Sequence, residues 1–148
     1  MNELRTEIEI NAPAAFIWDV LLNFGLFPTW NPFIQSIQGQ AIKGQRLRVH
    51  IAQPGGQTMT FRPRVTQVSV GREFRWLGHF GIPGLLDGEH IFELESLGKQ
   101  HTQLIHRECF RGVLVPVFWR TLNSQTRQGF EEMNQSLKQY VERNWKSD

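Results

Sequence analysis

Cysteine, long apolar runs and a strong charge of either sign are all scarce in this chain of 148 residues. Its single cysteine, Cys109, has no partner for an internal disulfide, which excludes the small disulfide-stapled folds and favours the reducing cytoplasm. The chain has no run of 18 apolar residues and no apolar leader, so we expect no stable membrane insertion and no secretory signal. With 16 basic and 14 acidic residues the net charge is only +2, which gives no sign of a nucleic-acid-binding surface.

Apolar residues, at 40% of the chain, are plentiful enough for the core of one domain spanning residues 1–148. Apolar and polar residues alternate from Leu4 to Ile10, which predicts a strand with one buried face. The spacing then changes at Pro13, a residue suited to a first helical turn, and a short amphipathic helix is expected to end near Gly25.

Residues 33–111 have the pattern of an antiparallel sheet, with strand-length segments separated by turns that contain glycine. In "TMTFRPRVTQVSV" the alternation slips by one residue near Gln67, which predicts a bulge that bends the sheet. Pro63 indicates an edge or bulge position in the same segment.

The last third of the chain changes to helical spacing, with apolar residues three or four apart from Val115 to Trp145. This predicts one amphipathic helix of roughly thirty residues that begins around Pro116. Thr126 and Gly129 interrupt the apolar stripe with small side chains, which leaves room for another group beside the helix.

Several motifs resemble one known superfamily across nearly the whole chain: "INAPAAFIWDVL" at 10–21, "WNPFI" at 30–34, "RWLG" at 75–78, "HIFELESLG" at 90–98 and "LIHRECFRGVLVPVFW" at 104–119. Together with the element order, they resemble the helix-grip superfamily of START domains, pollen-allergen-type proteins and bacterial polyketide cyclase/dehydrase-like proteins. The resemblance implies an α+β helix-grip fold, a curved antiparallel sheet of about six or seven strands wrapped around a long C-terminal helix. Two short helices are expected after the first strand.

The resemblance also implies a hollow between sheet and helix that binds a hydrophobic or amphipathic small molecule, such as a lipid, a polyketide-like compound or an aromatic metabolite, without a cofactor. It does not imply a particular reaction, because fold alone does not determine function. We expect the wall of this hollow to be formed by Trp30, Phe33, Phe61, Trp76, His90, Phe92, His106, Glu108, Phe110, Trp119, Leu122, Thr126, Gly129, Phe130 and Met133.

The clearest chemical signal is a polar cluster expected in the hairpin around residues 97–99. Side chains two apart in a strand point the same way, so His90, His106 and Glu108 should share the face of the large apolar residues. Three interpretations remain open: a structural hydrogen-bond network, the polar end of a ligand pocket, or acid–base catalysis in a cyclase or dehydratase. The spacing of these residues matches no dedicated metal signature, so we expect no metal site.

Two further segments carry open alternatives. "WNPFI" is either a structural corner around a buried Trp30 or part of the cavity mouth. The segment "GHFGIPGLLDG" lacks the lysine and the following helix of a phosphate loop, and it is either a mobile entrance to the cavity, with Ile82, Leu85 and Leu86 exposed, or a plain surface loop.

The sequence therefore predicts a binding protein, with a cyclase or dehydratase using His and Glu as the alternative. A protein that only contacts a partner through its sheet or long helix is a third possibility, and the oligomeric state is not predicted.

Overall fold

The computed structural model describes residues 2–55 and 57–145. Along the chain the strands and helices are β1 (Asn2–Ile10), α1 (Ala14–Leu22), a 3₁₀ turn (Phe24–Leu26), α2 (Phe27–Trp30), β2 (Ile34–Gln38), β3 (Arg48–Ala52), β4 (Thr58–Phe61), β5 (Arg64–Ser69), β6 (Glu73–His79), β7 (Asp87–Gly98), β8 (His101–Arg111), α3 (Val115–Thr121), a π-helical turn (Leu122–Thr126) and α4 (Arg127–Asn144).

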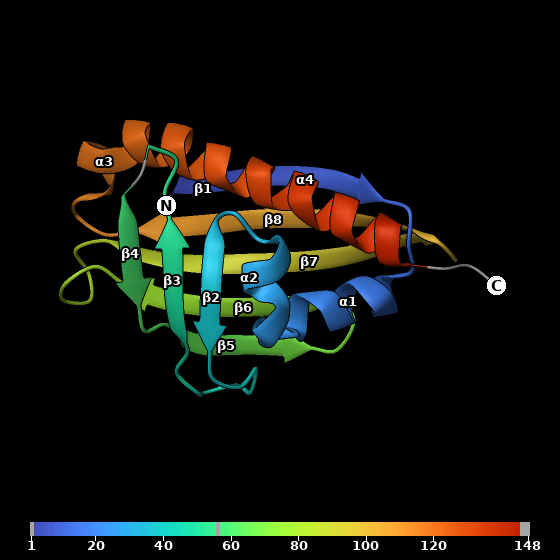
Figure 1. Cartoon of the computed structure of the whole chain (residues 1–148). Helices are drawn as coiled ribbons and strands as arrows, with labels where there is room; N and C mark the ends of the chain where they lie inside the picture. Colours follow the sequence, from blue (N-terminus) through green and yellow to red (C-terminus); the bar gives the residue numbers. More distant parts are fainter. Residues whose placement is uncertain (1, 56, 146–148) are drawn as a thin grey trace.

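The strands form two antiparallel sheets, in the orders β1-β8-β7-β6-β5 and β2-β3-β4. Figure 1 shows the smaller sheet running across the larger one, with α4 lying along the side of β1 and β8. This is the α+β architecture that the sequence predicts, with short helices after the first strand and a long helix at the C-terminal end of the described chain. The strands are slightly more numerous than expected, because the short strands β2 to β4 form a separate sheet.

The bend of the larger sheet has the predicted origin. The register between β5 and β6 shifts between Val65 and Gln67, and a bulge of this kind increases strand twist and curvature. Pro63 lies between β4 and β5, where its missing amide hydrogen removes no bond within a strand.

The hairpin of β7 and β8 differs from expectation in one detail. β7 continues to Gly98 and the turn comprises residues 99–100, one position later than predicted, with a register shift between Ser96 and Gly98. His90 is consequently paired with Glu108, and Phe92 with His106. Of the two registers that the sequence permits, the structure contains the one that sets His90 opposite the carboxylate.

The terminal helical segment begins at Val115, close to the predicted start, and runs to Asn144 with a π-helical turn in the middle. Its inward stripe is fully buried at Phe130, Met133, Leu137 and Val141. The π-helical turn widens the helix locally, and such turns frequently occur at functional sites. Among the described residues, no helix is long and apolar enough to cross a membrane.

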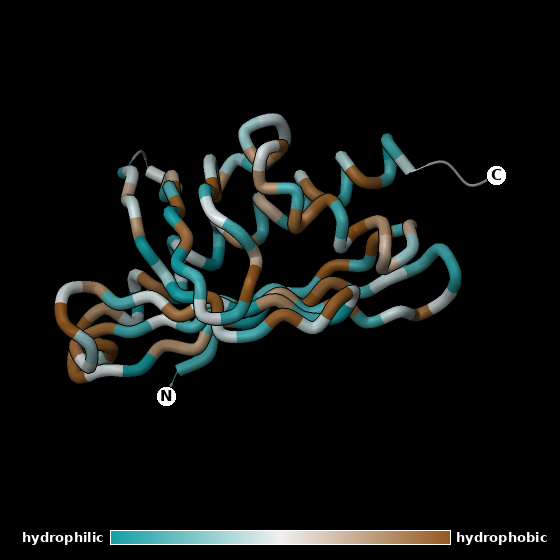
Figure 2. Tube along the Cα trace, turned by 90° about the horizontal axis from the view of Figure 1, so that it is seen from below, coloured by the Kyte–Doolittle hydropathy of each residue, from teal (hydrophilic) through white to brown (hydrophobic). Residues whose placement is uncertain are grey.

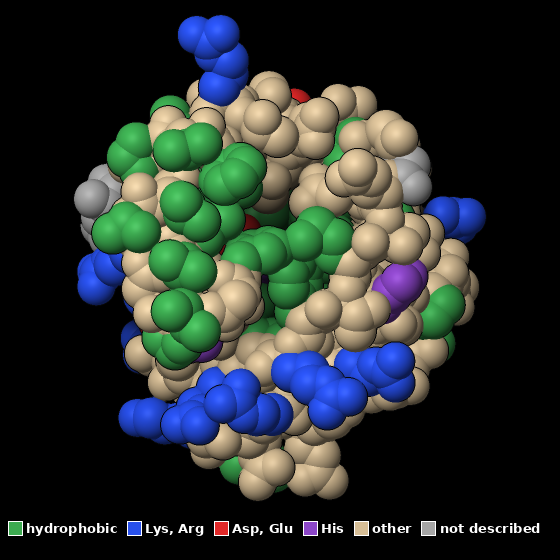
Figure 3. Space-filling view, turned by 90° about the vertical axis from the view of Figure 1, so that its left-hand side faces the viewer, with side chains coloured by type: hydrophobic (Ala, Val, Ile, Leu, Met, Phe, Trp, Pro, Cys, Tyr) green, Lys and Arg blue, Asp and Glu red, His purple; other side chains and the backbone are tan. Residues whose placement is uncertain are grey.

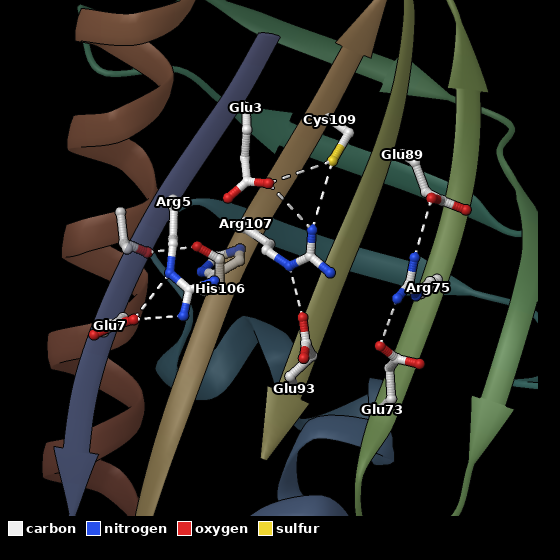
Figure 4. Close-up of polar contacts among 11 residues, drawn as sticks. Glu3, Arg5, Glu7, Glu73, Arg75, Glu89, Glu93, His106, Arg107 and Cys109 are labelled. Carbon is white, nitrogen blue, oxygen red and sulfur yellow. Dashed lines mark hydrogen bonds and ion pairs between the residues drawn. The ribbon is translucent and has the colours of Figure 1, made fainter. Parts of the chain in front are cut away.

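The outward face of the larger sheet carries paired arginines and glutamates (Figure 4). Arg75 contacts Glu73 at 2.7 Å and Glu89 at 3.3 Å, and Arg107 contacts Glu93 at 2.6 Å. Solvated pairs of this kind contribute little to stability, about 0 to 1 kcal/mol each. They leave the opposite face of the same strands free for the core and the cavity.

Candidate functional site

A hollow opens at one end of the molecule, between the larger sheet, the smaller sheet and the π-helical turn. Figure 3 shows this hollow lined by apolar side chains, with further apolar side chains exposed beside it. The enclosed cavity measures about 60 Å³, and the hollow measures about 550 Å³ when its open mouth is included. Its lining residues are Phe33, Ile51, Gln53, Phe61, Pro63, Trp76, Gly78, Phe80, Gly88, His90, Glu108, Phe110, Leu122 and Thr126.

The polar end of the cavity is formed by Glu108 on β8 and His90 on β7. Glu108 Oε1 lies 3.9 Å from His90 Nδ1, which is too long for a direct hydrogen bond. The carboxyl group occupies the space that a side chain at position 88 would take, since a Cβ on Gly88 would lie 2.2 Å from Glu108 Oε2. The glycine near the start of β7 thus creates the niche that holds the carboxyl group.

A chain of hydrogen bonds leads from His90 away from the cavity, through the core, to β1. His90 Nε2 lies 2.6 Å from His106 Nε2, and His106 Nδ1 lies 2.7 Å from Asn134 Oδ1 on α4. Asn134 Nδ2 donates to Thr6 Oγ1 at 2.9 Å, and Thr6 Oγ1 donates to the backbone oxygen of His106 at 2.7 Å. Three strands and the long helix are therefore joined by one buried polar path.

The direction of donation along this series of hydrogen bonds follows from the donors and acceptors that each group has. The single hydroxyl proton of Thr6 is used on a carbonyl, so Thr6 must accept from the Asn134 amide, and the Asn134 oxygen then accepts from Nδ1–H of His106. A neutral His106 consequently has a lone pair on Nε2, which accepts from Nε2–H of His90. The remaining lone pair, on Nδ1 of His90, faces Glu108.

Burial determines the charge of all three groups. It lowers the pKa of His106 to about 3, although the bond with Asn134 acts in the opposite direction. Burial, and next the neighbouring His106, lower the pKa of His90 well below its usual value. Burial raises the pKa of Glu108 to about 8, even though 16% of its side chain remains accessible. Near neutral pH the cluster is therefore uncharged, with two neutral imidazoles and a protonated carboxyl group.

Aromatic rings hold the two imidazoles in place. His106 stacks on Phe130 with ring centroids 3.9 Å apart and planes 6° apart, and on Phe92 at 4.6 Å. His90 lies 4.7 Å from the rings of both Trp76 and Phe92. This packing fixes the ring planes, and so fixes where His90 Nδ1 points.

Part of the expected cavity wall lies elsewhere. Behind the two histidines the interior is filled, so Phe92, His106, Phe130 and Met133 belong to the buried core and do not line the cavity. Gly129 does not border empty space either, because the ring of Phe33 occupies it; a Cβ on Gly129 would lie 2.3 Å from that ring.

The two predicted tryptophans Trp30 and Trp119 also lie outside the cavity. Trp119 packs against Phe110 at 6.2 Å and is not part of the lining. Trp30 is buried between Phe27, at 5.1 Å, and Tyr140, at 6.3 Å. "WNPFI" thus forms a structural corner at Trp30 and Asn31, in which Asn31 Oδ1 accepts bonds from the backbone N–H groups of residues 33 and 34 at 2.9 and 2.8 Å. Phe33 of the same motif lines the cavity, so both interpretations hold in part.

The segment before β7 is partly exposed, as expected. Ile82 is 66% exposed, but Leu86 is buried and Leu85 is half-buried, so the expectation of three exposed apolar residues was wrong for these two. The exposed residues Val113, Val117 and Phe118 belong to the neighbouring α3 and the turn before it. Figure 2 shows apolar residues gathered at this end of the molecule.

Sequence reasoning missed the two residues that complete the polar chain. Asn134 follows Phe130 by four positions, so it lies on the buried stripe of the helix, and a polar residue there was a usable signal. Thr6 occurs among the inward residues of β1. The glycines Gly78 and Gly88, paired near the ends of β6 and β7 that meet, were a further signal of close approach.

Within residues 2–55 and 57–145, no group of three or more His, Cys, Asp and Glu side chains is placed to hold a metal ion. Two imidazoles bonded to each other through Nε2 have used the nitrogens that a shared metal would need. The arrangement can instead offer hydrogen bonds from neutral groups at the end of an apolar hollow.

Comparison with known proteins gives a consistent result. Residues 1–142 match the family described as polyketide cyclase / dehydrase and lipid transport. No curated protein matches this sequence.

Solved structures share the fold at low sequence identity. A START superfamily protein from Mycobacterium smegmatis has a TM-score of 0.77 and 21% identity, covering 95% of this chain and 97% of its own. The Zhui aromatase/cyclase from Streptomyces sp. R1128 has a TM-score of 0.79 and 16% identity, covering 99% and 96%. A protein from Thermus thermophilus has a TM-score of 0.76 and 13% identity, covering 98% and 100%. Because the family match extends over nearly the whole sequence, the chain belongs to the polyketide cyclase / dehydrase and lipid transport family.

Proposed function

We propose that this protein binds a hydrophobic or amphipathic small molecule in the cavity between the sheets and the C-terminal helical segment, with Glu108 and His90 contacting the polar part of the ligand. The observation that carries the proposal is the pair of polar side chains, Glu108 and His90, whose facing atoms lie 3.9 Å apart at one end of a mostly apolar cavity, with burial raising the pKa of the Glu108 carboxyl group to about 8. Such a group costs stability, and strongly shifted pKa values in a cavity are typical of functional sites.

The size of the cavity bears on how a ligand enters. A volume of about 60 Å³ has room for only a few water molecules, so a larger ligand needs the side chains at the mouth to move. Phe61 and Phe80 pack edge to face at the mouth, with centroids 4.9 Å apart, and Leu122 begins the π-helical turn beside them. We infer that these residues separate when a ligand enters, while the histidine cluster stays fixed.

The alternative function is acid–base catalysis in a cyclase or dehydratase. One observation favours it: a carboxyl group with a pKa of about 8 is protonated at neutral pH and suited to act as a general acid. The resemblance to an aromatase/cyclase structure is consistent with this interpretation. In that case Glu108 would donate the proton, His90 would face the same part of the substrate, and His106 would act only through its bond to His90.

Binding can be tested with naphthalene as a probe, followed through the backbone amide signals in ¹H–¹⁵N spectra. We expect saturable shifts at Gly78 and Gly88, which line the cavity, and no shift at Glu131 on the outer side of α4. Absence of any saturable shift, together with native mass spectrometry that detects no retained small molecule, would overturn the proposal.

Variants separate a carrier from a catalyst. Replacing Glu108 by alanine should weaken ligand binding modestly in a carrier, but abolish turnover with binding retained in a catalyst. Glu95→Ala, on the exposed end of β7, is the matched control.

We propose that ligand binding takes place in the cytoplasm, since the lone cysteine suits a reducing compartment.

A further inference from the structure

We propose that the polar end of the cavity recognises a neutral hydroxyl group, and that Thr6 and Asn134 are positioning residues that set this preference through His106. The inference rests on the proposed function, because it concerns the ligand of the same cavity. It selects one chemical class among the hydroxyl, carbonyl and carboxylate groups that a mixed polar site could hold.

The first step is the gap between Glu108 and His90. Their facing atoms, Oε1 and Nδ1, are 3.9 Å apart, so they do not bond to each other directly. One oxygen atom between them can lie at about 2.8 Å from both, which is a normal hydrogen-bond distance. The gap therefore has the size of a single bridging oxygen.

The second step is the chemistry of the two sides. The chain from Thr6 leaves His90 Nδ1 with a lone pair, so this side needs a donor. A protonated Glu108 supplies a donor of its own, so the other side needs an acceptor. A hydroxyl group is donor and acceptor at a single oxygen atom. A carbonyl or ether oxygen only accepts, and it leaves His90 Nδ1 without a hydrogen-bond partner. An unpaired buried acceptor costs free energy, which makes the site discriminate.

The third step is charge. None of the described residues that line the cavity is lysine or arginine, and both histidines are neutral. A ligand carboxylate or phosphate would enter an apolar cavity beside a carboxyl group without a cation to pair with. An ammonium group would require an ionised Glu108 and the burial of two charges. Burying the anion, or burying the ammonium together with an ionised Glu108, costs more free energy than burying a neutral alcohol or phenol.

Thr6 is the residue that orients the chain. If its hydroxyl is removed, the Asn134 amide loses its acceptor and is free to turn its NH₂ group toward His106 Nδ1. The proton positions on both imidazoles then reverse, and His90 presents Nδ1–H in place of a lone pair. Thr6 precedes Asn134 by 128 positions and does not line the cavity. Its replacement would nevertheless change the hydrogen-bonding group that His90 presents to the ligand.

The test compares four probes that share one ring system: 2-naphthol, 2-methoxynaphthalene, naphthalene and 2-naphthoate. We expect 2-naphthol to bind about tenfold more tightly than 2-methoxynaphthalene, the size of one well-made hydrogen bond. Naphthalene should bind about as weakly as the ether, and naphthoate most weakly. Binding of 2-naphthol no tighter than of the ether, or tightest binding of naphthoate, overturns the inference while leaving the proposed function intact. If no probe binds and native mass spectrometry detects no retained small molecule, the proposed function itself fails.

The positioning role is tested with Thr6→Val, which keeps the side-chain shape, and Thr6→Ser, which restores the hydroxyl. Imidazole ¹⁵N spectra should report protonation at Nε2 of His90 and at Nδ1 of His106 in the wild type and in Thr6→Ser. In Thr6→Val the pattern should become mixed or reversed, and the preference for 2-naphthol over the ether should disappear. A wild-type spectrum with His90 protonated at Nδ1, or an unchanged preference in Thr6→Val, refutes the assignment.

Discussion

Replacing Glu108 by glutamine should make the protein more stable in mildly alkaline solution. The carboxyl group is isosteric with the amide, and burial raises its pKa from the ordinary 4.5 to about 8. The unfolded chain loses this proton above about pH 4.5, but the folded chain keeps it until about pH 8. Folding therefore takes up a proton in this interval, and stability falls as the pH rises through it.

The histidines act in the opposite direction and at lower pH. Both have lowered pKa values in the folded state, so the stability associated with them is lost as the pH falls below the usual value of 6.5. Between about pH 6.5 and pH 8, Glu108 is the only one of the three that changes the free energy of unfolding. At about 1.4 kcal/mol per pH unit, this carboxyl group should cost about 2 kcal/mol across that interval.

The assay is urea unfolding, followed by far-UV circular dichroism at several pH values between about 6 and 8.5. We expect the free energy of unfolding of the wild type to fall by about 2 kcal/mol across the interval, and that of Glu108→Gln to stay nearly level. Glu95→Gln, on the exposed part of β7, should retain the slope of the wild type. Parallel curves for the wild type and Glu108→Gln would refute the claim that this carboxyl group is buried and protonated.

Three other substitutions test the packing around the site. Gly129→Ala should destabilise the fold by about 1 to 3 kcal/mol, as measured by urea unfolding, because its new methyl group would meet the ring of Phe33; unchanged stability would mean that the ring does not fill this space. Asn31→Ala should cost about 1 to 3 kcal/mol in the same measurement, since two buried backbone N–H groups lose their acceptor; a cost near zero would contradict the role of the corner. Gly88→Ala should displace the carboxyl group of Glu108 and flatten the pH dependence of stability, and a slope as steep as that of the wild type would contradict the niche.

Much of the fold follows from local patterns in the sequence. The alternation in β1, the slip near Gln67 and the helical spacing after Val115 each depend on neighbouring residues, and each is found in the structure. The pairing of His90 with Glu108 could be narrowed to two registers, because side chains alternate between the faces of a strand. The turn lies one position later than predicted, and this position determines which of the two registers forms.

The parts of the site that sequence reasoning did not give depend on contacts between distant elements. Gly129 was interpreted as free space, but a small helical residue can equally accommodate a neighbouring ring, here that of Phe33 from before β2. Thr6 and Asn134 lie 128 positions apart, and their bond depends on how α4 rotates against β1. Helical spacing places Asn134 on the buried face, but it does not say which strand that face meets.

The most direct test of a ligand site at the polar end of this cavity is a measurement of nuclear Overhauser effects between bound 2-naphthol and the protein. The account predicts contacts from the naphthol ring to the side chains of Trp76 and Phe110, with its oxygen between Glu108 and His90. Contacts confined to the outer groove between β1 and α4, at Ile8 and Gln135 for example, would contradict it.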